Sequence, residues 1–156
     1  MKRQIALISL LFIAGFCQSH ATDSRTFVNP GIKLGYTFGD QRGFTFGFEC
    51  SITRMVGDRF TFGGVAAVDF CRQLFRAHTG VQASWGVGVE WGPTFIRDGS
   101  QSQFGHSLTA FLGFVAYPYY TMTFRGESPT LYEFGSYLKA PIRVAGPDLT
   151  LFGGNE

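Results

Sequence analysis

The chain has 156 residues, enough for one domain, and 17% of them are aromatic while only 15% are charged. Many aromatics and a formal net charge of only +2 exclude a disordered chain and give no indication of nucleic acid as a partner. The 21 Gly and 18 Phe residues exclude a coiled coil or long helical bundle, which would be rich in Ala, Glu, Lys and Leu.

The first 21 residues have the pattern of a secretory signal peptide. A basic start, MKR, precedes an apolar run over residues 5–16, and small residues stand at positions 19 and 21, where signal peptidase reads them. The run is shorter than the roughly 20 apolar residues that span a bilayer. We therefore expect cleavage after Ala21 and a single mature domain of residues 22–156. Lipoprotein processing at Cys17 is the alternative, although Phe16 stands where that processing prefers a small residue.

Along the mature chain, apolar residues alternate with polar or small ones, which is the period of a β-strand. The apolar positions are odd over residues 75–95 and even elsewhere, and residues 107–125 are the least regular. No helix of useful length is predicted. The alternating segments are residues 31–39, 43–53, 59–70, 75–95, 107–125 and 132–142.

The change from even to odd positions is explained by a two-residue hairpin turn at Arg72-Gln73. Such a turn pairs Cys71 with Leu74 and Phe70 with Phe75, and paired residues face the same side of a sheet. The apolar face must then switch parity after the turn, as the sequence does.

Parity is retained between the second and third segments, which predicts a loop of odd length. Residues 55–57 suit a three-residue loop with Gly57 in the left-handed conformation. We expect this hairpin to place Ile52 opposite Phe60 and Cys50 opposite Phe62.

The number of strands is six to eight. Residues 75–95 would span roughly 70 Å at ~3.3 Å per residue, so they form either one long strand or two strands joined near Trp85-Gly86-Val87. Residues 149–152 are a candidate for a further strand. Residues 97–106 are expected to be the longest loop.

The composition of the two faces indicates which of them is inside. The face opposite the apolar one is mostly Gly, Thr and Ser, which suits the narrow interior of a small closed barrel. The sequence therefore predicts an all-β, antiparallel up-and-down barrel of about eight strands that turns its apolar face to lipid. The lipid-facing residues are expected to include Phe44, Phe46, Phe48, Phe60, Phe62, Phe70, Trp85 and Trp91.

With a signal peptide, apolar-out strands of about 10 residues and many aromatics, the chain resembles the small outer-membrane β-barrels of Gram-negative bacteria, of the OmpA/OmpX type. The resemblance covers the mature chain and implies a location in the outer membrane. It also implies two partners, the membrane lipid and the barrel assembly machinery. The chain departs from the family in its short loops and in its last residues, FGGNE, where many members end in an aromatic residue.

Charged residues on the polar face are expected to pair inside the barrel, because burying unpaired charges is costly. We predict an ion-pair network that fills the lumen and leaves no open pore. In such a network Glu49→Gln should destabilise the barrel, and removing Lys33 as well should restore part of the loss. The network is expected to consist of Lys33, Glu49, Asp69, Arg76, Glu90, Glu133 and Lys139.

The function favoured by these patterns is a structural or surface-interaction role in the outer membrane. One alternative is a soluble exported β-barrel that binds an apolar ligand. Another is a lipid-modifying barrel enzyme, for which His106 and Ser107 at a loop end are candidates, although the chain lacks a G-x-S-x-G motif. His78 on the polar face is expected to be a hydrogen-bonding residue.

No metal, cofactor or catalytic residue is predicted. Cys50 and Cys71 remain in the mature chain, and two cysteines are too few for a disulfide framework. Because their positions have opposite parity, their side chains should point to opposite faces of the sheet. We expect both to be free thiols.

Overall fold

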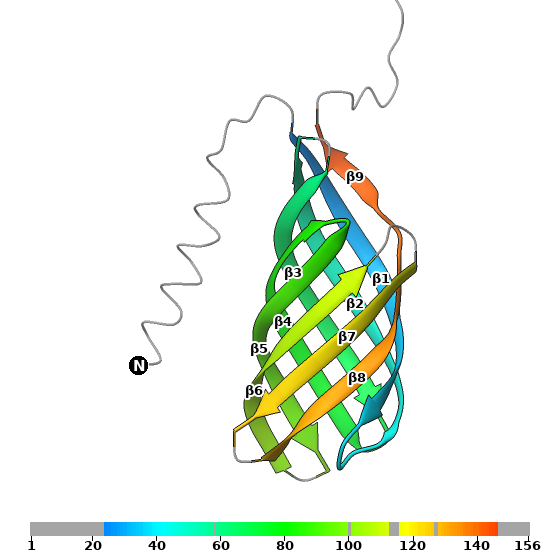
Figure 1. The fold of residues 1–156 in the computed structure, drawn as a ribbon, viewed down its shortest axis with the longest axis vertical. Coiled ribbons are helices and arrows are strands. Elements are labelled where there is room, and N and C mark those ends of the chain that lie inside the picture. The colour runs from blue at the N-terminus through cyan, green and yellow to red at the C-terminus, as the bar shows by residue number, and fades with distance from the viewer. Residues whose placement is uncertain (1–23, 58, 100, 113–115, 127, 147–156) are drawn as a thin grey trace, which may run out of the picture.

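The alternating segments fold into β-strands that pair with their neighbours in the chain (Figure 1). The structure is a computed structural model and describes residues 24–57, 59–99, 101–112, 116–126 and 128–146. Its strands are β1 (Ser24–Phe38), β2 (Gly43–Val56), β3 (Phe60–Cys71), β4 (Leu74–Trp85), β5 (Val87–Asp98), β6 (Gln101–Leu112), β7 (Ala116–Arg125), β8 (Ser128–Lys139) and β9 (Ile142–Ala145). Within these described ranges, no helix is long and apolar enough to cross a membrane.

Pairing between the first and eighth strands closes the sheet into a barrel. β1 is antiparallel to β2 on one side and to β8 on the other, with a β1–β8 register from Gly31↔Lys139 to Phe38↔Tyr132. Short β9 adds to the start of β1, where Val28 pairs with Ile142. Closure gives each of the eight barrel strands two neighbours, so the barrel has no free edge. The predicted all-β antiparallel barrel of about eight strands is confirmed.

The predicted turn at Arg72-Gln73 is confirmed, and the structure decides between one strand and two for residues 75–95. Arg72-Gln73 is a two-residue hairpin turn, with Cys71 paired to Leu74, and Arg72 takes a positive φ of 52°. Residues 75–95 are two strands, because the chain reverses at Gly86, whose φ is 76°. Glycine takes this left-handed conformation at little cost, which allows a one-residue connection there.

One predicted loop and one predicted strand were wrong. Residues 97–106 are not a loop, since β5 continues to Asp98 and β6 begins at Gln101, with Gly99 at a φ of 56°. Polar residues at this barrel rim have the composition of a loop although they pair as strands. Residues 107–125 are not one strand but parts of β6 and β7. The proposed strand at 149–152 and the signal peptide at 1–21 lie outside the described residues.

The predicted register of the β2–β3 hairpin was wrong by four positions. Ile52 pairs with Gly64 and Cys50 with Ala66, because β2 extends to Val56, which pairs with Phe60. Gly57 has the expected left-handed conformation, with a φ of 62°. Moving the turn by two residues leaves every side chain on the same face, so alternation does not locate the turn. Both cysteines are free, with Cys50 exposed and Cys71 buried, as their parity predicted.

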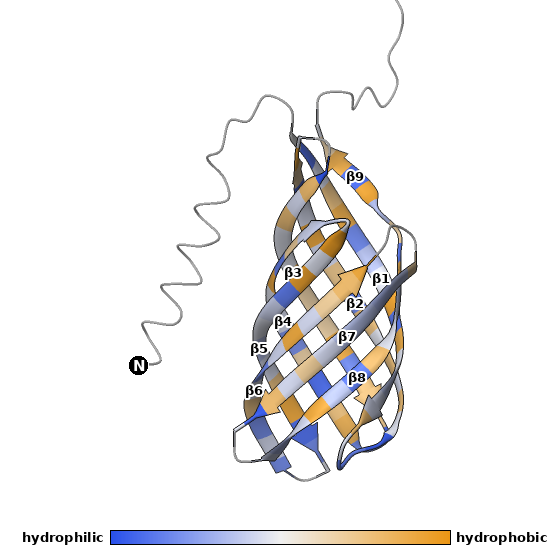
Figure 2. Ribbon diagram, viewed as in Figure 1, coloured by the Kyte–Doolittle hydropathy of each residue, from blue (hydrophilic) through white to orange (hydrophobic). Residues whose placement is uncertain are grey.

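Side chains alternate between the lumen and the outer surface, and the strands in Figure 2 carry alternating hydrophobic and hydrophilic bands. Seven of the eight residues predicted to face lipid are exposed on the outer surface. The eighth, Phe62, is half-buried and stacks on Phe60, with 6.2 Å between the ring centroids. Inside the barrel, one cluster of buried apolar side chains lies near the end formed by the β3–β4 turn and consists of Cys71, Leu74, Ile96 and Leu131. A second cluster consists of Phe111, Tyr119 and Tyr137, with Tyr117 packed against it.

Candidate functional site in the barrel lumen

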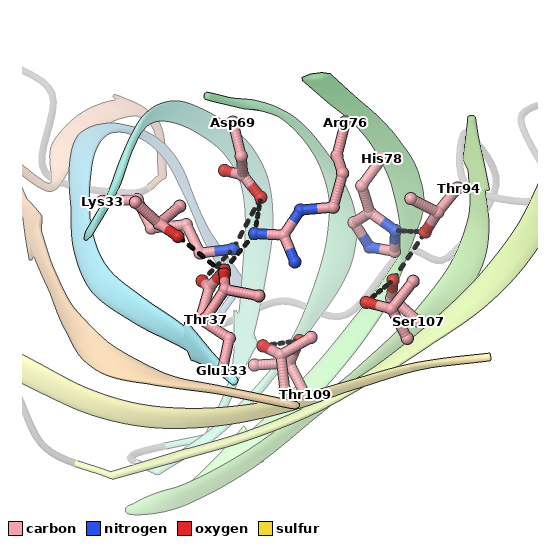
Figure 3. Close-up of polar contacts among 12 residues, drawn as sticks. Lys33, Thr37, Asp69, Arg76, His78, Thr94, Ser107, Thr109 and Glu133 are labelled. Carbon is pink, nitrogen blue, oxygen red and sulfur yellow. Dashed lines mark hydrogen bonds and ion pairs between the residues drawn. The ribbon is translucent and has the colours of Figure 1, made fainter. Parts of the chain in front are cut away.

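Four charged side chains from four strands meet in the middle of the lumen (Figure 3). Lys33 Nζ lies 2.8 Å from Asp69 Oδ2 and 2.9 Å from Glu133 Oε1. Arg76 pairs with the same two carboxylates, at 3.2 Å from Asp69 Oδ2 and in direct contact with Glu133. Each side chain is at most 5% exposed. Two cations and two anions make the cluster neutral, which offsets the cost of burying its charges.

Glu133 is the most heavily bonded member of this cluster. Besides the two cations, its carboxylate accepts a hydrogen bond from the Tyr119 hydroxyl at 2.5 Å and one from Thr37 at 3.0 Å. The ring of Tyr119 stacks on that of Tyr137, with 4.3 Å between centroids. Carboxylates are buried at tolerable cost when their lone pairs are used in this way.

Glu49 and Lys139 form a second ion pair, separate from the first cluster. The Lys139 ammonium lies 4.6 Å from the ring centroid of Tyr137, 5.4 Å from that of Phe111 and 5.6 Å from that of Tyr117. The cation in contact with Glu49 is therefore Lys139 and not Lys33, whose removal was expected to compensate for the loss of Glu49. Parity placed both lysines in the lumen, but their heights along the barrel depend on strand register.

Glu90, the remaining predicted member, pairs with His78 at 2.9 Å. The other ring nitrogen of His78 lies 3.0 Å from the Thr94 hydroxyl, which in turn lies 2.6 Å from the Ser107 hydroxyl. This chain of hydroxyl, imidazole and carboxylate has the order of groups found in a hydrolase triad. It is buried, however, and the adjoining cavity has a volume of only about 10 Å³, roughly the room for one water molecule.

The pair His106 and Ser107 does not form a site. Both residues lie within β6 rather than at a loop end, and neighbouring residues of a strand point to opposite faces. Ser107 is buried in the lumen, while His106 is exposed on the outer surface and stacks on Trp91 at 5.9 Å. Throughout the described ranges, no group of three or more His, Cys, Asp or Glu residues could hold a metal ion.

Sequence reasoning did not assign the lumen tyrosines to the network. Tyr119 and Tyr137 stand at odd positions, which belong to the polar face of their strands. The structure places both in the lumen, 1% and 2% exposed. Parity was the signal that could have identified them.

One end of the lumen is closed by polar side chains at the turns. Arg125 Nη2 pairs with Asp40 Oδ1 at 2.7 Å and its Nε donates to the Pro129 carbonyl at 2.8 Å. Partial burial would raise the pKa of Asp40, but the hydrogen bond and charge of Arg125 outweigh that effect and hold the pKa below its ordinary value. The apolar cluster lies close to this pair, since Gly39, next to Asp40 in the chain, lies against Leu131.

The other end, where the described chain begins and ends, opens into a cavity of about 800 Å³ that we call the vestibule. Lys139 reaches its base, so the Glu49–Lys139 pair separates the vestibule from the lumen below. Its lining comprises Phe27, Asn29, Ser51, Thr53, Met55, Arg59, Thr61, Gln82, Ser84, Trp85, Gly86, Phe111, Tyr117, Lys139 and Pro141.

Comparison with known proteins finds no matching protein family and no matching curated protein. Two designed proteins of known structure are similar to this chain. One, from "De novo design of transmembrane beta-barrels", is 11% identical with a TM-score of 0.41, and the match covers 73% of this chain and 95% of the designed chain. The other, the solution NMR structure of the de novo designed TMB2.3, is 9% identical with a TM-score of 0.45, covering 76% of this chain and 98% of that one.

Proposed function

We propose that this chain is an outer-membrane β-barrel of the OmpA/OmpX type, with a structural or surface-interaction role and no open pore. The observation that carries the proposal is the arrangement of the two faces. Charged side chains such as Glu133 are 0% exposed inside the closed barrel, while aromatic side chains such as Phe44 and Trp91 are 63% and 55% exposed outside it. A soluble barrel has the opposite arrangement.

The dimensions of the barrel suit a bilayer. Most of its strands have 12 residues, or about 40 Å at ~3.3 Å per residue, and a tilt of about 40° reduces their height to roughly 30 Å. The hydrocarbon core of a bilayer is about 30 Å thick. A closed barrel also pairs its backbone N–H and C=O groups between strands, as a structure in lipid requires.

The absence of a pore is proposed from the filling of the lumen. The free space beside the central ion pairs is about 10 Å³, and the Glu49–Lys139 pair lies between it and the vestibule. Transport of a solute through the barrel would require breaking buried ion pairs, which costs about 3–5 kcal/mol each.

The outer membrane is proposed as the location because of the export signal predicted for residues 1–21. Lipid and the barrel assembly machinery are the partners that such a location implies. The soluble alternative lacks support, since the exposed aromatic side chains of the outer face would then meet water while charged side chains fill the lumen. The enzymatic alternative has a His78–Glu90 pair but no room beside it for a substrate.

The test is fractionation of cells that express the full chain, followed by an alkaline carbonate wash. We expect the mature protein in the outer-membrane pellet, with faster gel migration before heating than after it, as a folded barrel shows. A Phe48→Arg variant should lose this fraction and a Phe48→Leu variant should keep it. Release of the wild-type protein by the wash, in its folded form, would refute the membrane location.

A further inference from the structure

Three exposed arginines lie at the end of the barrel opposite the vestibule, and we call them the arginine rim. Arg42 belongs to the β1–β2 turn, Arg72 to the β3–β4 turn, and Arg97 stands one residue before the end of β5. The stem of Arg72 lies against Gly43, since a Cβ on that glycine would come within 3.3 Å of Arg72 Cγ and Cδ. Arg97 pairs with Phe75 on the strand that leaves the β3–β4 turn. The three side chains therefore belong to neighbouring parts of the barrel end.

The carboxylates of this end do not pair with the arginine rim. Asp40 pairs with the buried Arg125 at 2.7 Å, and Asp98 accepts hydrogen bonds from the Gln41 amide at 3.0 and 3.2 Å. Among the described residues of this end, four arginines and two aspartates leave a net charge of +2. Counting Glu127 of the sequence, which stands between β7 and β8, leaves +1. The excess is positive and lies on the side of the barrel formed by β2 to β5.

Two of the guanidinium groups are held by the backbone of their own turns. Arg42 Nε donates to the Gly39 carbonyl at 3.2 Å, and Arg97 Nε donates to the Gly99 carbonyl at 3.4 Å. These bonds use Nε and leave the two terminal nitrogens of each guanidinium for another acceptor. Adjacent N–H donors of arginine match two oxygens of a phosphate group, which accepts such bonds strongly. The rim therefore suits a phosphate.

The outer surface beside the arginine rim is aromatic. Phe44, Phe70 and Phe95 each stand two residues from one arginine of the rim. Phe44 and Phe70 are exposed, and Phe95 packs edge to face on the exposed Phe104, with 5.4 Å between the ring centroids. Aromatic side chains with cations next to them are typical of the level where acyl chains meet lipid headgroups. A free phosphate ion makes no use of this surface, whereas a lipid has an apolar part as well as a headgroup.

We propose that the arginine rim binds the phosphate group of an anionic membrane lipid, in the leaflet that surrounds this end of the barrel. The phosphate oxygens accept hydrogen bonds from the terminal nitrogens of the rim, while the acyl chains lie on the exposed phenylalanines beside it. The proposal rests on the membrane location proposed above and names the class of lipid, which that location leaves open.

The experiment uses the mature barrel refolded in micelles of an uncharged detergent at low salt. Short-chain phosphatidic acid, short-chain phosphatidylcholine and inorganic phosphate are titrated separately, and binding is followed by calorimetry and by NMR shifts. We expect saturable binding of phosphatidic acid, with shifts at the arginine rim and the phenylalanines beside it, and binding at least about tenfold weaker for the other two. One arginine near an anionic lipid contributes about fivefold to binding, so Arg72→Gln should weaken it by that factor. Replacing all three arginines by Gln should weaken it about a hundredfold.

The matched control replaces Arg25, Arg54 and Arg59 at the vestibule end by Gln, which removes the same charge and should leave binding unchanged. Heat-modifiable gel migration establishes that each variant is folded. If the triple rim variant does not fold, the Arg72→Gln variant and the NMR shifts of the wild-type protein decide. Absence of saturable phosphatidic acid binding, shifts away from the rim, equal binding of inorganic phosphate, or an equal loss in the control would each overturn the proposal. The membrane location is tested separately, since a barrel that withstands the carbonate wash without binding phosphatidic acid contradicts this proposal alone.

Discussion

Replacement of Glu133 by Gln tests whether the central ion pairs stabilise the barrel. The substitution keeps the size of the side chain but removes its charge, so Lys33 and Arg76 are left with Asp69 as their single carboxylate. The cluster then carries a buried net charge of +1. Removing one partner of a buried ion pair costs about 3–5 kcal/mol. Since Glu133 is 0% exposed and contacts both cations, we expect a loss of that size.

The measurement is the free energy of unfolding in urea, with the barrel in lipid vesicles and unfolding followed by tryptophan fluorescence. A Lys33→Met/Glu133→Gln double variant restores neutrality and should recover about 1–3 kcal/mol of the loss. Asp40→Asn is the control, because the Asp40 carboxylate is 43% exposed and the Asn side-chain oxygen can still accept the hydrogen bond from Arg125, so its loss should be smaller. A loss for Glu133→Gln no larger than that of the control, with no coupling to Lys33, would refute the reasoning.

The outer face, the cysteines and the lumen glycines give three further predictions. Phe48→Arg, at mid-strand on the outer face, should lower the stability of the inserted barrel by about 2–4 kcal/mol, measured by refolding into vesicles. In the folded barrel, a lipid-soluble maleimide should label Cys50 and not Cys71, and denaturation without reductant should expose two thiols, counted by titration. Gly88→Val should cost about 1–3 kcal/mol in urea unfolding, because its side chain would overlap the Phe111 ring, and Phe111→Ala should relieve the cost.

Each of these has an outcome that contradicts it. Equal stability of the Phe48→Arg and Phe48→Leu variants would mean that the outer face does not meet lipid. A 50–71 disulfide found by mass spectrometry would contradict the strand register, in which Cys71 lies five residues along β3 from the partner of Cys50. Gly64 faces outward with open space around it, so Gly64→Val is the control for Gly88→Val. Equal losses at the two glycines would remove the packing argument.

The sequence by itself determined the class of the fold and the face of almost every side chain. Strict alternation needs only the period of two of a strand, which is a local property of the backbone. Parity alone therefore put Lys33, Glu49 and Glu133 on one face and Phe44 on the other. The turn at Arg72-Gln73 was also readable, because a two-residue hairpin must change the parity of the apolar face.

Tertiary structure decided the positions along the strands and hence the partners. Ile52 pairs with Gly64 rather than Phe60, and Glu49 with Lys139 rather than Lys33. Alternation is unchanged when a strand slides by two residues, so it leaves the height of each side chain in the barrel open. The stagger between strands and the closure of β1 on β8 set that height, and both depend on contacts between residues far apart in the sequence.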